Sequence, residues 1–474
     1  MKQFAAAALT IALASAKAEE DRMTSLPQMG TFDKFGAFSG MLPIEGTSKE
    51  LHYLFFESQN DSANDPVLIW FNGGPGCSSM LGFMQENGPF RLESGGTKFH
   101  ESEFAWNRET NLLYIEMPAG VGFSYCEGVK DCAFDDDKTA TDNLTVVLEW
   151  FEKFPEFKNN DLWISGESYG GVYVPYLTYY IWQHNQENAA NDDVFKPNIK
   201  GFAVGNGVTN WEYDTTQAYV DMAYWHSLMD EAMHDKFVEL NCDWNMPYML
   251  NVSDDCMNLY SEFDSLVADV NVYDIFGTCW GLGPYPQEGT PSMYGEKHSD
   301  FHQKFVTPAD YTPWVAGPKK HDPKKLQELP PCTFGSELLD YMNSKEVRTA
   351  MHIPDKVQAW DLCKTGLVYD SGKKASQWIY EALADTPIRM LHYSGDTDGA
   401  VPTVGTQNWI ASLNWNKTSE WSTYMVEGQV AGYWESYEGD LTFGTVHGAG
   451  HMAPQFKPPQ TYHLVFNWML GRDI

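Results

Sequence analysis

Short apolar runs that stop at Asn, Gly or Pro residues recur in the first part of the chain. These runs cover residues 67–71, 112–115, 162–164 and 202–204. Between them, residues 139–154 and 173–185 carry apolar side chains at roughly helical spacing. Short runs bounded by turn residues indicate strands, and their alternation with helical segments predicts an α/β sheet covered by helices.

The same alternation returns near the C-terminus, in residues 388–393, 422–426 and the helical segment 462–470. The middle of the chain differs, because residues 209–332 are largely helical in pattern and hold four of the eight cysteines. Within it, residues 283–331 are rich in Pro, Gly, Lys and His and lack periodicity, which is typical of a long surface loop. We therefore interpret the middle as a cap inserted into an α/β core.

Composition excludes one class of partner. Hydrophobic residues make up 43% and aromatic residues 15% of the 474 residues, as in globular proteins. Asp and Glu number 65 against 31 Lys and Arg, which gives a formal net charge of -34. Because no basic surface is available to neutralise phosphates, we expect no nucleic-acid partner. The acidic balance also fits a protein that stays soluble in an acidic compartment.

The N-terminus has the features of a secretory signal peptide, which we place at residues 1–18. Lys2 precedes an apolar run over residues 4–13, and small residues suited to cleavage follow it. That run is too short to span a bilayer and no other stretch is long enough, so we expect no membrane span. The secretory route agrees with sequons for N-glycosylation at Asn60, Asn143, Asn251 and Asn416.

The eight cysteines are then expected to form up to four disulfides, because the secretory pathway is oxidising. Cys126 and Cys132 are close enough in sequence to close a small local loop. Spacing alone does not assign the other partners. The sequence contains no tight C-x-x-C pair of the kind that zinc sites use, and we expect neither a metal nor another cofactor.

The sequence GESYG at residues 166–170 fits the G-x-S-x-G pattern of a nucleophile elbow. A serine at a strand-to-helix turn projects its hydroxyl, and flanking glycines let neighbouring backbone approach closely. A strand over residues 162–165 is expected before the motif, and a helix from about Gly171 after it. The alternative is an ordinary glycine-rich turn, but this context favours Ser168 as a nucleophile.

A serine nucleophile requires a base, and the base requires an orienting carboxylate. The carboxylate is expected next along the chain, followed by the histidine. YSGDTDG at residues 393–399 offers Asp396 and Asp398, and the glycine-rich segment 445–454 offers His447 and His451. The residues alone do not decide within either pair. A metal site at the two histidines is disfavoured, because Gly-Ala-Gly between them is a poor helix and no Glu follows the first.

An acyl intermediate also requires hydrogen-bond donors for its oxyanion. Tyr169, directly after the candidate nucleophile, supplies one backbone N–H, and the second donor usually comes from a loop after an earlier strand. WFNGGPGC at residues 70–77 provides such a loop. The sequence therefore contains all the parts of a serine-dependent acyl-transfer site.

With these parts in view, the chain strongly resembles the serine carboxypeptidases. The matching motifs follow the family's order over nearly the whole mature chain: WFNGGPGCSS (70–79), ENGPF (86–90), NLLYIEMPAGVGFSY (111–125), GESYGGVYVP (166–175), GNGVTN (205–210), YSGDTDGAVP (393–402) and GAGHMAP (448–454). The resemblance implies an α/β-hydrolase fold with a central mixed, mostly parallel sheet and an inserted, largely helical cap. The core would comprise residues 19–208 and 333–474, and the cap residues 209–332.

The resemblance also assigns roles to individual residues. It selects Asp398 and His451 as the partners of Ser168, and the backbone N–H groups of Gly74 and Tyr169 as the oxyanion hole. The groups that it assigns to the substrate's terminal carboxylate are Asn72, the N–H of Gly73, Glu86 and Glu167.

Disulfide pairing follows from the same resemblance. The family's pattern pairs Cys77 with Cys363, and the cap cysteines as Cys242–Cys256 and Cys279–Cys332; Cys126 and Cys132 remain and are paired by proximity. Some relatives have the cap loop excised and persist as two disulfide-linked chains. Residues 283–331 lie between Cys279 and Cys332, so a cut there need not separate the pieces, and excision is a hypothesis for this chain.

A carboxylate beside the nucleophile is unexpected if the substrate ends in a carboxylate, because two like charges repel. A protonated Glu167 would instead donate a hydrogen bond to that terminus. Two close carboxyls in a partly buried site resist double ionisation, so we expect Glu86 and Glu167 to titrate with a raised apparent pKa. The alternative is a structural carboxyl that caps a backbone group. The first interpretation predicts that peptide hydrolysis has its optimum at acidic pH.

The sequence thus predicts a serine-type carboxypeptidase that hydrolyses the C-terminal bond of peptides and proteins at acidic pH through an acyl-enzyme. Two alternatives stay open: an acyltransferase with the same catalytic residues, and a stabilising partner for another lysosomal enzyme, which some relatives combine with peptidase activity. The expected location is the secretory pathway, ending in a lysosome or vacuole or outside the cell. A homodimer is an open alternative for its assembly.

Overall fold

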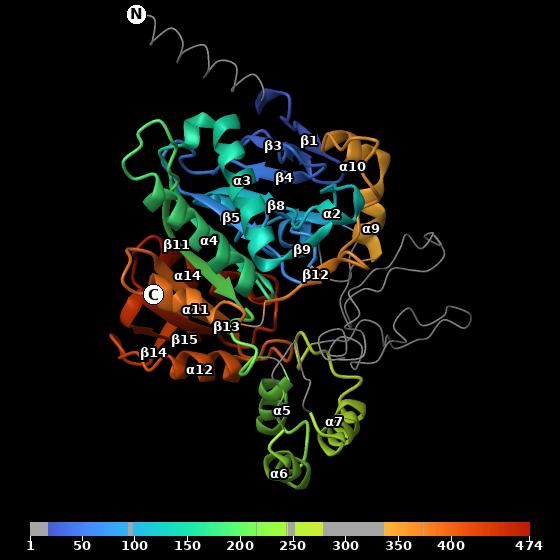
Figure 1. The fold of residues 1–474 in the computed structure, drawn as a ribbon, viewed down its shortest axis with the longest axis vertical. Helices are drawn as coiled ribbons and strands as arrows, with labels where there is room; N and C mark the ends of the chain where they lie inside the picture. Colours follow the sequence, from blue (N-terminus) through green and yellow to red (C-terminus); the bar gives the residue numbers. More distant parts are fainter. Residues whose placement is uncertain are drawn as a thin grey trace, which may run out of the picture. The chain divides into compact units, whose positions relative to one another are not determined.

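The computed structural model describes residues 18–92, 98–214, 216–242, 244, 252–277, 336–372 and 374–474 (Figure 1). The chain divides into two compact units. The first comprises residues 1–203, 335–369 and 385–390, and the second comprises residues 204–334, 370–384 and 391–474. The predicted cap belongs to the second unit, and its exact boundaries stay a prediction. The predicted excision loop, 283–331, lies outside the described residues, as does nearly all of the predicted signal peptide.

The first unit is built on buried strands in the order β10-β5-β8-β4-β3. Their bounds are β10 (Asp161–Glu167), β5 (Val67–Phe71), β8 (Asn111–Ile115), β4 (Glu50–Phe56) and β3 (Ala37–Pro43). β5 runs parallel to both β10 and β8, whereas β4 is antiparallel to β8 and to β3. Every residue of β5 is buried, as expected for a parallel strand that is covered on both faces.

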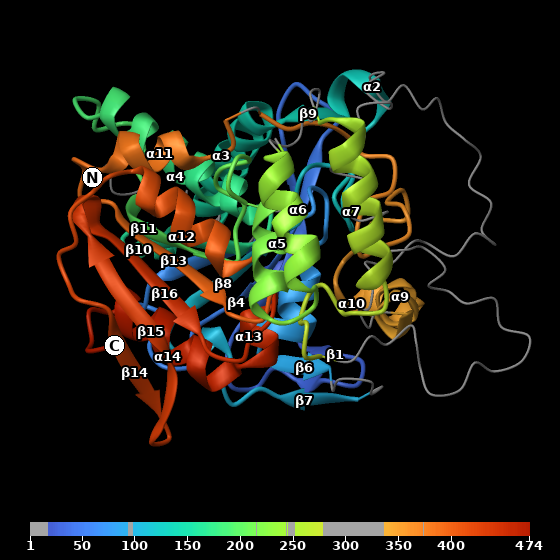
Figure 2. The same cartoon turned by 90° about the horizontal axis from the view of Figure 1, so that it is seen from below.

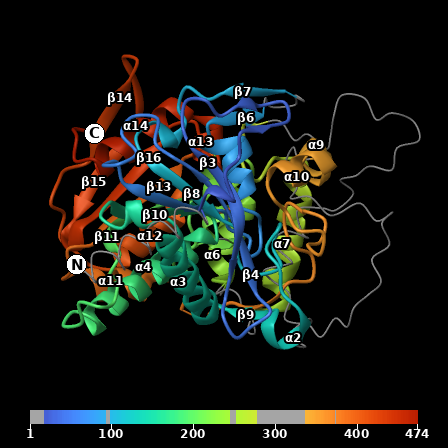
Figure 3. The same ribbon diagram turned by 90° about the horizontal axis from the view of Figure 1, so that it is seen from above.

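Two long helices of the first unit pack beside each other and against these strands, α3 (Asp136–Lys153) and α4 (Gly170–Glu187) (Figure 3). α3 starts at a cap, since the side chain of Asp135 accepts a hydrogen bond from the Lys138 N–H at 2.7 Å. Trp150 of α3 meets Phe55 of β4 edge-on, with ring centroids 5.0 Å apart. Burying such a ring contributes roughly 2–3 kcal/mol, so this contact helps to fix α3 on the sheet.

Shorter elements complete the first unit. They are β1 (Ser25–Leu26), β2 (Gly30–Thr31), the π-helix η1 (Gly82–Glu86), β6 (Phe90–Leu92), β7 (Phe99–Glu101), η2 (Trp106–Arg108), α2 (Gly128–Asp131), β9 (Ala133–Asp135), η3 (Pro155–Phe157), α9 (Ser336–Asn343) and α10 (Lys345–Ala350). Along the chain, the boundaries between the units fall within β11 (Asn198–Gly205), β12 (Val368–Asp370) and β13 (Arg389–Gly395).

The second unit has strands in the order β14-β15-β16-β13. β14 (Ser422–Val426) is antiparallel to β15 (Gln429–Tyr437), which is antiparallel to β16 (Leu441–Val446). The associated helical elements are α11 (Gln377–Leu383), α12 (Thr403–Ser412), η6 (Glu438–Asp440), α13 (Ala453–Phe456) and α14 (Pro458–Met469). β13 ends just before Asp396 and β16 ends just before His447. Neighbouring strands therefore deliver the two candidate Asp residues and the two candidate His residues to adjacent turns.

Three further helices of the second unit lie in the predicted cap: α5 (Thr216–Trp225), α6 (Glu231–Leu240) and α7 (Asp254–Leu266). α6 contacts both of the others, and Figure 2 shows the three side by side. Two of them begin at side-chain caps, because Asp230 accepts from the Met233 N–H and Ser253 from the Cys256 N–H. The described residues of the predicted cap thus contain three helices.

The fold class predicted from the sequence is confirmed: a mixed sheet with helices. The apolar runs at 67–71, 112–115, 162–164 and 202–204 lie in β5, β8, β10 and β11, and the two helical segments lie in α3 and α4. The antiparallel pair β3–β4 was not predicted. Among the described residues, none of the helices combines the length and the apolar character needed to cross a membrane.

Candidate active site

The first unit holds the candidate nucleophile at the turn between β10 and α4. Ser168 has φ 60°, in the left-handed region of backbone conformation. Residues other than glycine seldom adopt this conformation, because it strains the backbone. A Cβ on Gly166 would lie 2.5 Å from the carbonyl oxygen of Phe71, so glycine is required for strands β10 and β5 to approach here. The Ser168 carbonyl accepts the Gly171 N–H at 2.9 Å as α4 begins. This is the strand–turn–helix context expected of a nucleophile elbow.

The loop that follows β5 passes directly beside this turn. A Cβ added to Gly73 would lie 2.4 Å from the backbone nitrogen of Tyr169 and 2.7 Å from Cβ of Ser168. Glycine at position 73 therefore lets the loop approach the candidate nucleophile. Gly74 adopts φ 116°, in the region that favours glycine. The predicted oxyanion donors, Gly74 and Tyr169, thus come from two segments in close contact.

One amide group joins the two predicted carboxylate-binding glutamates. The Asn72 Nδ2 donates to Oε1 of Glu86 at 2.8 Å and to Oε1 of Glu167 at 2.9 Å. The Asn72 Oδ1 accepts the Trp70 indole N–H at 2.9 Å and the Gly82 N–H at 2.9 Å. These four contacts fix which end of the Asn72 amide faces the glutamates. Both glutamates and Asn72 are buried, so the structure brings three predicted residues together next to Ser168.

Two groups near Glu86 have pKa values that burial shifts from their ordinary range. Burial lowers the pKa of the Arg91 guanidinium, and the charge of Glu86 partly offsets that change. Burial raises the pKa of the Tyr114 phenol well above its ordinary range, and Glu86 adds to the increase. Glu86 therefore lies in a poorly solvated part of the first unit, where a negative charge is costly unless it is paired or protonated.

The second unit holds a buried Asp–His pair. The Asp398 Oδ2 lies 2.7 Å from Nδ1 of His451. Asp398 also accepts hydrogen bonds from the Asn206 side chain at 2.9 Å, the Ala400 N–H at 2.7 Å and the Val401 N–H at 3.1 Å. Because these donors hold the carboxylate in place, Asp398 can orient the imidazole of His451.

The other two candidates pair with each other. Nδ1 of His447 lies 2.7 Å from Oδ2 of Asp396, but the His447 side chain is 64% exposed and that of Asp396 31%. Water competes for such a pair, so it holds an imidazole less firmly than the buried pair does. Burial therefore favours Asp398 with His451 over Asp396 with His447, and the choice of the catalytic pair stays a prediction.

A family model for the serine carboxypeptidases matches residues 27–471 of this chain. The chain belongs to the serine carboxypeptidase family. It is 33% identical to serine carboxypeptidase 1 of Hordeum vulgare over 94% of each chain. It is 32% identical to the lysosomal protective protein of Mus musculus over 96% of this chain and 94% of the relative. The predicted family is therefore confirmed, and with it the assignment to the serine-type hydrolases.

A solved structure supports the fold. The prohormone-processing carboxypeptidase Kex1(Δ)p of Saccharomyces cerevisiae superposes with a TM-score of 0.72 at 20% identity and covers 96% of both chains. This carboxypeptidase-family member thus has the α/β-hydrolase fold.

Three disulfides link described cysteines of this serine carboxypeptidase: Cys77–Cys363, Cys126–Cys132 and Cys242–Cys256. They are the same pairs that the family pattern and proximity predicted. Cys77–Cys363 follows immediately on the loop of Gly73 and Gly74. The fourth predicted pair, Cys279–Cys332, lies outside the described residues.

One predicted glycosylation site is wrong for the folded chain. Asn143 lies within α3 and is only 1% exposed, so the packed helix leaves no space for a glycan. Asn60 and Asn416 are exposed and stay predictions; Asn251 lies outside the described residues. The N-x-S/T pattern could not reveal the difference, because it carries no information about which face of a helix an asparagine occupies.

Two residues that hold the site were missed by the sequence reasoning. Asn206 supports Asp398, and a signal for it existed, because it lies in the motif GNGVTN. Asp136, the first residue of α3, accepts the hydroxyl groups of Tyr169 at 2.8 Å and Tyr369 at 2.9 Å. No local pattern marks Asp136, because its partners come from distant segments of the chain.

Proposed function

We propose that this protein removes the C-terminal residue of peptides and proteins at acidic pH through an acyl-enzyme formed on Ser168. The observation that carries the proposal is the Asn72 amide that binds Glu86 and Glu167 beside the Ser168 turn. A general esterase has no need for buried carboxyls next to its nucleophile. A carboxypeptidase does, since its substrate ends in an anion that the site has to recognise.

In the proposed mechanism His451 acts as the general base. Its Nδ1 is engaged by Asp398, which leaves Nε2 to take the proton from the Ser168 hydroxyl. The serine oxygen attacks the last peptide carbonyl, and the backbone N–H groups of Gly74 and Tyr169 donate to the oxyanion. His451 then returns the proton to the departing amine, and the C-terminal residue leaves. Water, activated by the same imidazole, hydrolyses the acyl-enzyme and restores Ser168.

The proposed carboxylate site works through a shared proton. Asn72 donates both amide hydrogens to the glutamates, which holds the two buried carboxyls close together. Full ionisation of both is unfavourable in such a place, so at acidic pH the pair retains a proton that it can donate to the substrate's terminus. At higher pH the pair loses that proton and repels the substrate. Peptide cleavage is therefore expected to weaken as pH rises through neutrality.

We also propose that the protein acts in a lysosome or vacuole. The disulfides indicate folding in the oxidising secretory pathway, and one relative is named as a lysosomal protein. Localisation of a tagged full-length chain against a lysosomal or vacuolar marker tests this directly. Diffuse cytosolic signal would contradict it.

The experiment that tests the reaction is digestion of an unblocked peptide at acidic pH, followed by mass spectrometry. The wild-type enzyme is expected to shorten the peptide from its C-terminus one residue at a time. Ser168→Ala is expected to lose at least a thousandfold in rate, as removal of a catalytic serine does in other enzymes. Internal cleavage products, or undiminished activity in Ser168→Ala, would contradict the proposal.

A further inference from the structure

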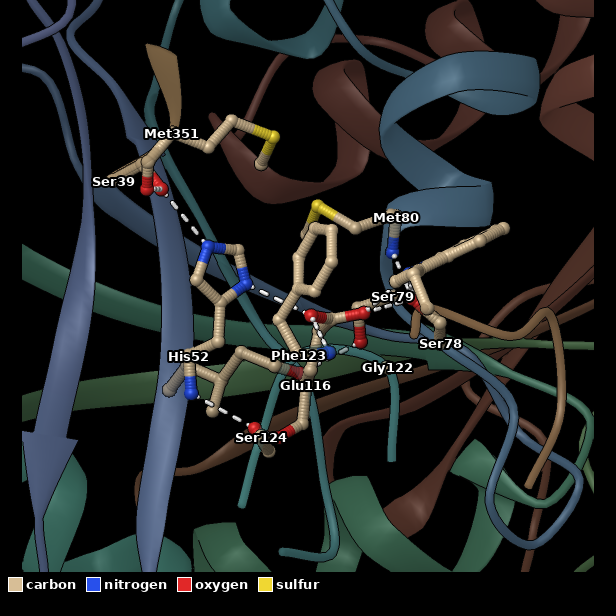
Figure 4. A network of polar contacts seen from close by, with 12 residues as sticks. Ser39, His52, Ser78, Ser79, Met80, Glu116, Gly122, Phe123, Ser124 and Met351 are labelled. Carbon is tan, nitrogen blue, oxygen red and sulfur yellow. Dashed lines mark hydrogen bonds and ion pairs between the residues drawn. The ribbon is translucent and has the colours of Figure 1, made fainter. Parts of the chain in front are cut away.

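A further buried carboxyl group of the first unit is that of Glu116, whose polar contacts Figure 4 shows. It follows directly on β8 and is fully buried. Its Oε1 accepts the Ser78 hydroxyl and, at 3.0 Å, the Trp360 indole N–H. Its Oε2 accepts the Phe123 N–H at 2.8 Å and lies 2.8 Å from Nδ1 of His52. Both oxygens of Glu116 are thus engaged in hydrogen bonds inside the unit.

The hydrogen bonds at the far side of His52 show how its ring is held. Nε2 of His52 lies 2.9 Å from the Ser39 hydroxyl oxygen, and that hydroxyl donates to the Met351 carbonyl at 2.7 Å. A hydroxyl has one hydrogen, so the Ser39 oxygen can only accept from His52. Nε2 of His52 then carries a hydrogen. The imidazole is held at both nitrogens, by Ser39 and by Glu116, and neither His52 nor Glu116 has any exposed side-chain surface.

Ser78 connects this pair to the loop beside the nucleophile. It is the next residue after Cys77, and its N–H donates to the Leu362 carbonyl at 2.7 Å. The Gly76 carbonyl accepts the Lys364 N–H at 2.8 Å. Together with Cys77–Cys363, these bonds tie the end of the loop to residues 362–364. Glu116 accepts from both partners, through Ser78 on the loop and Trp360 on the neighbouring segment.

The space around Glu116 is closed as well. A Cβ on Gly122, which has φ 53°, would fall on top of its Oε1. The carboxyl group of Glu116 therefore fills the space that the missing Cβ of Gly122 leaves. The Ser78 hydroxyl donates to a group that Gly122, Phe123 and Trp360 hold from other sides.

We propose that Glu116, held by His52, Phe123 and Trp360, is a positioning residue that fixes the loop from Gly73 to Ser78 and thereby aims the oxyanion donor of Gly74. It touches neither the substrate nor the reacting atoms. The inference rests on the proposed function, in which the Gly74 N–H donates a hydrogen bond to the oxyanion of the transition state. Loosening this tether misplaces a donor that matters for the oxyanion more than for substrate binding.

The test compares Glu116→Gln with wild type in three measurements on peptide cleavage. We expect kcat to fall about 10–100-fold and KM to stay within about threefold, as misplacement of a catalytic group by an ångström does. A Gln side chain has an acceptor at only one end, so it cannot satisfy the donors at both oxygens of Glu116. The affinity of a peptide aldehyde, which forms a tetrahedral adduct with the serine, is expected to fall by the same factor as kcat.

The aldehyde separates positioning from a loss of folded protein. A smaller folded fraction lowers the apparent kcat but leaves the inhibition constant of the remaining active enzyme unchanged. Asp142→Asn is the matched control, because it breaks the buried Lys49–Asp142 ion pair of the same unit, which contacts neither Glu116 nor the loop. We expect this control to lower the melting temperature and to leave the aldehyde affinity unchanged.

Ser78→Ala provides a second route if Glu116→Gln does not fold. It removes the link and leaves the other donors of Glu116 in place, so it is also expected to weaken aldehyde binding. Where both Glu116→Gln and Ser78→Ala fold, the double variant should lose less kcat than the two single effects combined, because both substitutions interrupt the same Ser78–Glu116 hydrogen bond. Unchanged aldehyde affinity in Ser78→Ala, or additive effects, would overturn the inference. A wild-type enzyme without carboxypeptidase activity would instead overturn the proposed function.

Discussion

The buried imidazole of His392 makes the stability of this protein depend on pH in a way that can be measured. His392 lies on β13, fully buried against Tyr380 and Trp409. Nδ1 lies 3.2 Å from the Tyr380 hydroxyl, and Nε2 has no hydrogen-bond partner among the described residues. A charge there would be unpaired, and burial lowers the pKa of His392 from 6.5 to about 3.

The sign and the size of the effect follow from that change in pKa. Between the two pKa values the unfolded chain binds a proton at His392 and the folded chain does not, so stability falls as pH falls below 6.5. Each pH unit costs about 1.4 kcal/mol in this window. At about pH 4.5 the penalty is therefore about 3 kcal/mol, and at about pH 7.5 it is absent.

His392→Gln removes the titration and keeps groups that can bind the Tyr380 hydroxyl. We expect the variant to be no more stable than wild type at about pH 7.5, and to gain about 3 kcal/mol relative to it by about pH 4.5. Thermal unfolding of both proteins across this range measures the difference, with the neutral samples as the internal control. A difference in melting temperature that does not change with pH, or that grows toward neutral pH, would refute the reasoning.

Three further predictions concern the second unit and the site. Burial raises the pKa of Asp214 to about 7, so the free energy of unfolding of wild type falls by about 3 kcal/mol between about pH 5 and pH 8, the opposite pH dependence to that of His392. Asp214→Asn should not show this loss of stability in thermal unfolding across the same pH range. Gly73→Ala should lower kcat/KM at least about 100-fold and also lower the melting temperature, because the added Cβ would lie 2.4 Å from the Tyr169 nitrogen and the backbone has to shift. Near-normal kinetics would contradict the close contact. In assays of peptide cleavage, Asp398→Asn should lower kcat about 10,000-fold, whereas Asp396→Asn should lower it less than tenfold. Equal losses of kcat in the two variants would contradict the choice of the buried pair.

Strands whose faces are both buried were predictable from the sequence, and the hairpin that mixes buried polar residues with apolar ones was not. The sequence of β5 is a continuous apolar run, as expected for a strand that is buried on both faces. β3 and β4 carry Ser39 and His52 at buried positions, which interrupt the apolar pattern. Those polar residues are buried only because Glu116 and Met351, far away in sequence, satisfy their hydrogen bonds.

The chemistry of the site was predictable by residue type, whereas the choice between equivalent residues was not. Asp396 and Asp398 lie in one turn, and their local sequence does not separate them. The difference comes from Asn206, which is 192 residues away from Asp398 in sequence and donates a hydrogen bond to its carboxylate. In the same way the motif pattern named Glu86 and Glu167, but only the folded chain shows that one Asn72 amide binds both.

The central claim is that protonated buried carboxyls recognise the anionic end of the substrate. The most direct test is kcat/KM against pH for one peptide with a free C-terminus and for the same peptide as its C-terminal ester, using wild type and Glu167→Gln. For wild type we predict that cleavage of the free peptide declines toward neutral pH while ester cleavage persists, and that Glu167→Gln narrows this gap. Parallel pH profiles for the two substrates in wild type would contradict the claim.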